Sequence, residues 1–114
     1  MNKANHSLYI ISASINNESD FNELLKTKDR VMMLIYASWC PFCVRFLPVF
    51  EKQAQEREDM VMVQDNQEII ADKYEVNVVP TILLFENGIL TNRLDGVLGI
   101  GLSEKGLLDF INNI

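Results

Sequence analysis

The sequence predicts an α/β domain in which about four helices flank a central mixed β-sheet of four to five strands. Apolar stretches of strand length alternate with stretches whose apolar residues recur at helical spacing, which is the pattern of parallel crossover units. Late in the chain, two strand-like stretches flank an Asn87-Gly88 turn, a strong hairpin signal that adds antiparallel pairing. The 114 residues, 48% of them hydrophobic, suffice for one domain over residues 1–114.

The first half of the chain contains two predicted strands and a capped helix between them. A short apolar run at residues 8–11 is a strand candidate. Residues 17–20 supply capping side chains, which predicts a helix through about Lys28. Residues 31–36 form an unbroken apolar run, as expected of a central strand that is covered on both faces.

A long helix is predicted from Pro41 onward, because apolar residues recur there at helical spacing; Pro48 inside it should produce a kink. The remaining elements follow in chain order: a strand at residues 61–63, a short helix at 67–74, hairpin strands at 81–85 and 89–90, and a last helix at 103–113. The expected order is therefore strand, helix, strand, helix, strand, helix, strand, strand, helix.

Composition and charge narrow the classes of function. Ten basic residues are scattered among sixteen acidic ones, and the net charge of −6 argues against a nucleic-acid partner, since phosphate binding needs clustered Lys and Arg. Residues 1–15 lack the long apolar core of a secretory signal, and no apolar run is long enough to cross a bilayer. We therefore expect a soluble, cytoplasmic protein without a membrane partner. In that compartment a Cys-x-x-Cys pair is more often redox-active or metal-binding than structural.

The two cysteines of the chain, Cys40 and Cys43, stand where a predicted strand passes into a predicted helix. A sulfur at Cys40 would face free backbone N–H groups and the positive end of the helix dipole, both of which favour the thiolate. Pro41 is tolerated there, because the first helical turn has no partner for its N–H. Cys43 lies one turn deeper on the same face. We expect exposed Cys40 to attack a substrate disulfide, and shielded Cys43 to attack the mixed disulfide that results.

Two other interpretations of the cysteine pair compete with this one. The pair could be half of a zinc site, but a tetrahedral site needs two more Cys or His ligands, and His6 is the only further candidate. The pair could also be two inert buried thiols, although inert cysteines need not fall at a strand-to-helix junction. We expect a redox role and no metal.

Further features accompany the pair: Trp39 before the first cysteine, Pro48 five residues after the second, Val79-Pro80-Thr81 before a strand, Asn87-Gly88 in a hairpin, and Leu102-Ser103 at the start of the last helix. In this combination the chain resembles the thioredoxin family over nearly its whole length. The resemblance implies the thioredoxin fold. It also implies protein-disulfide reductase activity with Cys40 as nucleophile and Cys43 as resolving thiol.

The resemblance further implies a substrate-binding set around the cysteines. Pro80 matches the family's cis-proline, which packs beside the disulfide and leaves the backbone of Val79 free to pair with an extended substrate segment. Trp39 matches the aromatic residue that flanks the nucleophile. Pro41 and Phe42, between the cysteines, complete the set.

Partners and an electron source are implied in the same way. Disulfide-containing proteins would be the substrates of a monomer, and a flavoprotein thioredoxin reductase would pass electrons from NADPH to the Cys40–Cys43 disulfide. No other cofactor is expected. Three alternatives stay open: glutathione-coupled reduction, suggested by the order Cys40-Pro41; disulfide oxidase or isomerase activity; and a binding module that docks a partner through Trp39 and Val79 without turnover.

Two departures from the family pattern concern the chemistry. Pro41-Phe42 separates the cysteines where Gly-Pro is usual, and this dipeptide tunes the redox potential. Leu34 stands where many thioredoxins bury an aspartate, and Val61 where they place a lysine. We therefore expect Cys43 to lack a proton acceptor and to lose its proton slowly at neutral pH.

Overall fold

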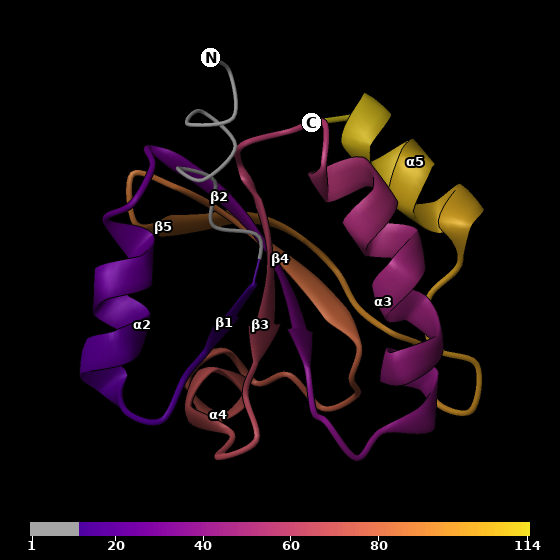
Figure 1. The fold of residues 1–114 in the computed structure, drawn as a ribbon, viewed down its shortest axis with the longest axis horizontal. Coiled ribbons are helices and arrows are strands. Elements are labelled where there is room, and N and C mark those ends of the chain that lie inside the picture. Colours follow the sequence, from indigo (N-terminus) through magenta and orange to yellow (C-terminus); the bar gives the residue numbers. More distant parts are fainter. Residues whose placement is uncertain (1–11) are drawn as a thin grey trace.

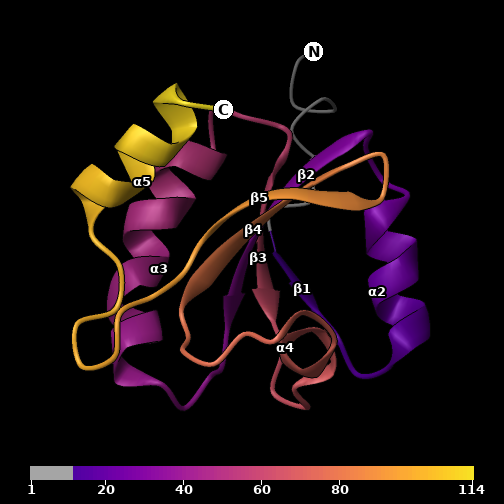
Figure 2. The same ribbon diagram turned by 180° about the vertical axis from the view of Figure 1, so that it is seen from behind.

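The computed structural model describes residues 12–114. In this part of the chain, five strands form one sheet and four helices lie against it (Figures 1 and 2). The strands are β1 (Ser12–Ser14), β2 (Arg30–Tyr36), β3 (Met60–Gln64), β4 (Thr81–Glu86) and β5 (Ile89–Leu94). The helices are α2 (Glu18–Leu25), α3 (Pro41–Ala54), α4 (Ile69–Tyr74) and α5 (Glu104–Asn112). The predicted fold class and order of strands and helices are confirmed.

The sheet has the strand order β1-β3-β2-β4-β5, with β2 at its centre. β3 runs parallel to β1 and β2, whereas β4 runs antiparallel to β2 and pairs with β5 in the hairpin. Leu34 in β2 stands opposite Met62 on β3 and Ile82 on β4. Because β2 and β3 are parallel neighbours, the loops that follow Tyr36 and Gln64 emerge at the same edge of the sheet.

Helices cover both faces of the sheet: α2 and α4 lie on one face, and α3 and α5 on the other (Figures 1 and 2). In β2, Met33 and Ile35 pack with residues of α2 and α4. Met32 and Leu34 pack with residues of α3 and α5. All four side chains are fully buried. Burial on both faces explains why this strand has no polar alternation.

α2 and α5 begin at side-chain caps. Asn17 and Ser103 each accept the backbone N–H three residues further on, at 2.8 and 3.0 Å, which satisfies one of the free donors of each helix start. α2 ends at Leu25, earlier than the sequence predicted. There the amide and the hydroxyl of Thr27 both donate to the carbonyl oxygen of Leu24 and close the last turn.

Three other boundaries deserve comparison with the sequence. The strand predicted at residues 8–11 lies outside the described residues, and the first described strand is β1. α4 begins at Ile69, two residues late, because a turn occupies residues 65–68 before it. β5 extends to Leu94, further than predicted, because its pairing with β4 continues through exposed polar residues that give no apolar signal.

α3 carries Pro48 in its interior, as predicted from the sequence; the kink stays a prediction. Its buried residues Phe46, Phe50 and Ala54 pack against the sheet and fix the direction in which the helix leaves the cysteines. Within residues 12–114, none of the helices is both long enough and apolar enough to cross a membrane.

Candidate active site

Cys40 and Cys43 lie at the junction of β2 and α3. Cys40 is the N-cap residue of α3, with an extended backbone (φ −93°, ψ 116°), and its sulfur accepts the backbone N–H of Cys43 at 3.2 Å. Pro41 follows in the first turn, where its missing N–H leaves no helical bond unmade. The Cys40 sulfur therefore takes the place that a capping oxygen holds in other helices. This is the junction that the sequence predicted.

The two thiols differ less in exposure than the sequence suggested. Both cysteines are free. Cys43 is fully buried, which confirms that it is shielded, but Cys40 is only 6% exposed. The expectation of an exposed Cys40 is therefore wrong for this dithiol form. The reason is the covering by Val79 and Phe42: the carbonyl oxygen of Val79 lies 3.6 Å from the Cys40 sulfur, and both side chains pack against the pair. Of the two cysteines, Cys40 is still the more exposed to solvent.

Burial raises the pKa of the Cys43 thiol to about 12, and its hydrogen bond with Cys40 adds to the rise. Cys43 is therefore protonated at neutral pH. Burial also raises the pKa of Tyr36, which packs against the pair, and the nearby Cys43 contributes. Both groups are held neutral, so Cys43 has to lose a proton before it can act as a nucleophile.

The segment opposite Cys40 is held by a small hydrogen-bond network. The Val79–Pro80 peptide bond is cis, as the resemblance implies. The hydroxyl of Thr81 donates to the carbonyl oxygen of Val78 at 2.6 Å and accepts the N–H of Gly96 at 3.1 Å. A Cβ at Gly96 would clash with the carbonyl oxygen of Pro80, so glycine is required at this close approach. The sequence analysis named Thr81 only as part of the Val79-Pro80-Thr81 motif and missed Gly96; a glycine in the segment between the hairpin and the last helix was the available signal.

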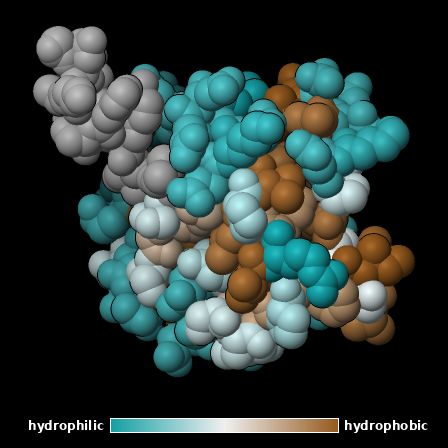
Figure 3. Space-filling model, turned by 45° about the vertical axis from the view of Figure 1, so that its right-hand side comes forward, coloured by the Kyte–Doolittle hydropathy of each residue, from teal (hydrophilic) through white to brown (hydrophobic). Residues whose placement is uncertain are grey.

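Apolar side chains border the opening at Cys40. Trp39 is 68% exposed. The loop at residues 95–103 approaches from the Phe42 side, since a Cβ at Gly101 would lie 3.2 Å from the Phe42 Cβ. This loop exposes three large apolar residues: Val97, Leu98 and Ile100. Figure 3 shows the side of the molecule that carries α3 and α5, where hydrophobic surface runs between hydrophilic regions and projects at one edge.

Two hollows in the surface are lined by residues next to Cys40. The first, about 130 Å³, is lined by Ala37, Trp39, Asp65, Glu68, Ala71, Val76, Asn77 and Val79. The second, about 160 Å³, is lined by Phe42, Arg45, Phe46, Val49, Ile100, Leu102 and Glu104. In the second, the Arg45 guanidinium lies 5.3 Å from the centre of the Phe42 ring. Residues next to Cys40 therefore line both hollows: Trp39 and Val79 line the first, and Phe42 lines the second.

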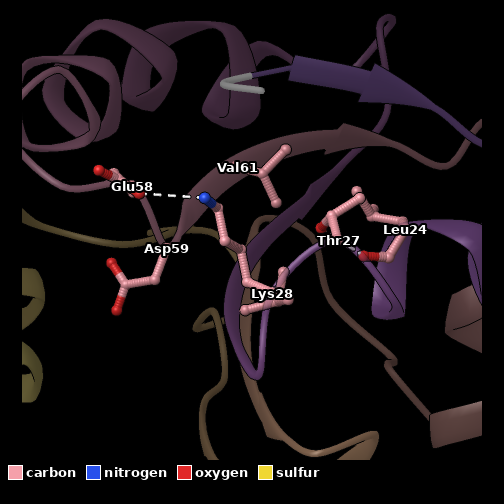
Figure 4. A pocket seen from close by; sticks show the side chains of 7 residues that line it. Leu24, Thr27, Lys28, Glu58, Asp59 and Val61 are labelled. Carbon is pink, nitrogen blue, oxygen red and sulfur yellow. Dashed lines mark hydrogen bonds and ion pairs between the residues drawn. The ribbon is translucent and has the colours of Figure 1, made fainter. Parts of the chain in front are cut away.

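A further hollow of about 80 Å³ lies at the amino ends of β2 and β3, at the opposite end of the sheet from the cysteines (Figure 4). Its most prominent polar contact is the bond from the Lys28 ammonium to Glu58 at 3.0 Å. None of the residues that the sequence predicted for the site lies there.

The surroundings of Leu34 are apolar. Leu34 is fully buried in the cluster that contains Phe46 and Met62. The register places Met62 beside Leu34 and leaves Val61 in the cluster on the opposite face, because neighbouring residues of a strand point to opposite faces. Met62 is thus the β3 neighbour of Leu34, and neither side chain can accept a proton.

Four of the five residues predicted to bind substrate lie beside the cysteines: Trp39, Pro41 and Phe42 are their neighbours in sequence, and Val79 contacts Cys40 from the loop before β4. Pro80 follows Val79 in that loop. Their role in substrate binding stays a prediction. Within residues 12–114, no three His, Cys, Asp or Glu side chains gather as a metal site would require, and His6 lies outside the described residues.

Comparison with known proteins assigns this arrangement to a family. The family model described as Thioredoxin matches residues 12–112. The chain belongs to the thioredoxin family. A thioredoxin of Rickettsia typhi is 32% identical over 105 residues, which cover 86% of this chain and 96% of that protein. A thioredoxin of Mycoplasmoides gallisepticum is 32% identical over 85 residues, which cover 72% of this chain and 85% of that protein.

A solved structure agrees with this assignment. Mitochondrial thioredoxin 3 of Saccharomyces cerevisiae, in its oxidized form, superposes with a TM-score of 0.71 at 29% identity, over 92% of this chain and 95% of that one. Together with the Cys40–Cys43 pair at the start of α3, family membership makes this thioredoxin-family protein a protein thiol-disulfide oxidoreductase.

Proposed function

We propose that this protein works in the reducing direction, as a protein-disulfide reductase. The observation that carries the proposal is the arrangement of the two thiols: Cys40, the less buried of the two, caps α3 beside exposed Trp39, and Cys43 lies fully buried one turn below. One thiol can meet a substrate while the other is kept from solvent and from competing partners.

In the first step, the Cys40 thiolate attacks one sulfur of a substrate disulfide. A bond forms between Cys40 and that sulfur, the substrate S–S bond breaks, and the leaving substrate thiolate takes up a proton. Val79 and Trp39 border this place, so an extended substrate segment beside Val79 would bring its disulfide to Cys40.

In the second step, Cys43 gives up its proton and attacks the Cys40 sulfur. The Cys40–Cys43 disulfide forms, and the second substrate thiolate leaves. The substrate has then gained two electrons and two protons. We propose that a flavoprotein thioredoxin reductase returns the pair to the dithiol with electrons from NADPH.

The proposed setting is the cytoplasm, where a glutathione poise of roughly −220 to −320 mV keeps most pairs of this kind reduced. We propose that the protein acts there as a monomer on disulfide-containing proteins. Related thioredoxins of two bacteria support this setting, and the excess of acidic residues suits a freely soluble carrier.

The test is reduction of insulin disulfides with electrons supplied in parallel by NADPH with thioredoxin reductase and by glutathione. We expect turnover with thioredoxin reductase, none with Cys40→Ser, and a trapped covalent complex with Cys43→Ser, because that variant completes only the first step. Inactivity of the wild type, or activity that survives in Cys40→Ser, would contradict the proposal. Turnover with glutathione alone would instead favour the glutathione-coupled alternative.

A further inference from the structure

We infer that Asn66 is a positioning residue of this site: through hydrogen bonds to Ser38 it holds the turn that carries Trp39 against the substrate groove. The inference rests on the proposed reductase function, because it assigns the part of the site that receives the substrate chain.

Two turns lie side by side at the edge of the sheet where Cys40 stands. One spans residues 37–40 and is closed by the bond from the Cys40 N–H to the Ala37 carbonyl oxygen at 3.2 Å. The other spans residues 65–68 and is closed by the bond from the Glu68 N–H to the Asp65 carbonyl oxygen at 3.0 Å. They follow the parallel neighbours β2 and β3, and the bond from the Asp65 N–H to the Tyr36 carbonyl oxygen, at 2.8 Å, extends the pairing up to them.

Ser38 and Asn66 join the two turns through two hydrogen bonds. The Ser38 N–H donates to Oδ1 of Asn66 at 2.9 Å, and Nδ2 of Asn66 donates to Oγ of Ser38, also at 2.9 Å. One amide thus uses both its acceptor and its donor on the same residue of the neighbouring turn. Two bonds between the same residues fix the orientation of the turn as well as its distance.

The turn that carries Asn66 is itself firmly anchored. The carboxylate of the preceding Asp65 is buried and accepts the backbone N–H groups of Ile70 and Ala71 at 3.1 and 2.9 Å, which ties the turn to the start of α4. Asn66 therefore projects from a rigid support. Ser38 and Trp39, by contrast, are exposed. Their own turn is closed by one hydrogen bond, from the Cys40 N–H to the Ala37 carbonyl oxygen.

Loss of the link should affect substrate binding more than the sulfur chemistry. Trp39 and Val79 line the same hollow of about 130 Å³, which is the substrate groove of this proposal. A freely moving turn would have to be ordered each time a protein substrate docks, which weakens binding. The Cys40 sulfur keeps its separate support from the Cys43 N–H, so its reaction with a small disulfide should continue.

Kinetics with two disulfides test this division. For Asn66→Ala we expect KM for insulin to rise about fivefold with kcat nearly unchanged, the size of effect that loss of an exposed hydrogen-bonded pair produces. The rate with hydroxyethyl disulfide should stay within about twofold of the wild type. Asn66→Asp should restore KM, because its two oxygens can accept the Ser38 N–H and hydroxyl. Asn92→Ala, an exposed asparagine of the edge strand β5, is the matched control.

A spectroscopic readout tests the turn without any turnover. Trp39 is the only tryptophan of the chain, so time-resolved fluorescence anisotropy reports on this turn alone. We expect a larger fast component in Asn66→Ala and the wild-type decay in Asn66→Asp and Asn92→Ala. Unchanged anisotropy and KM in Asn66→Ala would overturn the inference, as would an equal loss with both disulfides. A wild type that fails to reduce insulin, with anisotropy that responds as expected, would refute the reductase proposal and not the link.

Discussion

Single residues decide how the second half of the reaction proceeds. Cys43 is fully buried, and the pKa of its thiol is raised to about 12, so its thiolate is scarce at neutral pH. Leu34 and its β3 neighbour Met62 offer no proton acceptor. We therefore expect resolution of the mixed disulfide to accelerate with pH, because the thiolate fraction rises as pH approaches the pKa from below.

Leu34→Asp tests whether a missing proton acceptor limits this step. We expect faster resolution of the mixed disulfide at neutral pH, and a loss of about 3 kcal/mol of unfolding free energy, because a polar group is placed in an apolar cluster. Rapid-quench measurement of mixed-disulfide decay and chemical denaturation give the two quantities. Leu34→Asn is the matched control: it should lose similar stability without a gain in rate. Equal decay rates in the two variants would show that proton transfer to this position does not limit the reaction.

Asp65 gives a prediction about pH and stability. Burial raises the pKa of its carboxyl above the ordinary 3.8, although the N–H groups of Ala71 and Ile70 oppose the rise. The folded state therefore holds this proton more tightly than the unfolded chain. The resulting stabilisation is complete below the unfolded pKa and is lost as pH rises through the folded one.

Asp65→Asn removes this titration. The unfolding free energy of the wild type, measured relative to Asp65→Asn by guanidinium denaturation, should fall as the buffer is raised from about pH 4 toward neutrality. A difference that stays constant, or that grows with pH, would contradict the assigned direction of the pKa shift.

At the scale of the elements, the loop between β5 and α5 contacts the segments on either side of Cys40. Gly96 lies against the carbonyl oxygen of Pro80, and its N–H bonds the hydroxyl of Thr81. Gly101 lies against Phe42. This loop therefore contacts both segments that cover Cys40. A change in the conformation of the loop should alter the surroundings of the Cys40 sulfur.

Gly96→Ala tests that contact. The added methyl group has to displace the backbone at Pro80, so we expect a loss of about 2 kcal/mol of stability together with slower reduction of insulin. Gly99→Ala in the same loop is the comparison. Its φ of +80° disfavours alanine by about 1 kcal/mol, but nothing lies within 4 Å of the new Cβ, so turnover should change little. If turnover decreases by the same factor in both variants, the effect comes from strain in the loop and not from the contact with Pro80.

The elements that the sequence predicted best are those whose apolar pattern is strongest. The central run at residues 31–36 and the helix that starts at Pro41 appear as β2 and α3. β5 was predicted too short because an edge strand with polar residues has no apolar period. α2 was predicted too long because its end depends on the hydrogen bonds of Thr27, a residue that is compatible with either a helix interior or a helix end.

At the scale of the whole molecule, the site draws on segments that are distant in the chain and that the sheet brings together. The cysteines and Trp39 follow β2, Asn66 follows β3, and Val79 precedes β4. The cysteine pair could be predicted from local spacing and helix-start chemistry. The burial of Cys40 could not, because part of its cover comes from Val79, which is distant in the chain. Asn66 escaped prediction for a similar reason: its contact with Ser38 depends on the register of β2 and β3.

Alkylation of the reduced protein with iodoacetamide at neutral pH, followed by peptide mass spectrometry, tests the division of labour between the two thiols most directly. The structure predicts that the label appears on Cys40 while Cys43, fully buried and protonated, stays unmodified. Labelling of both cysteines at the same rate, or of Cys43 first, would contradict the account.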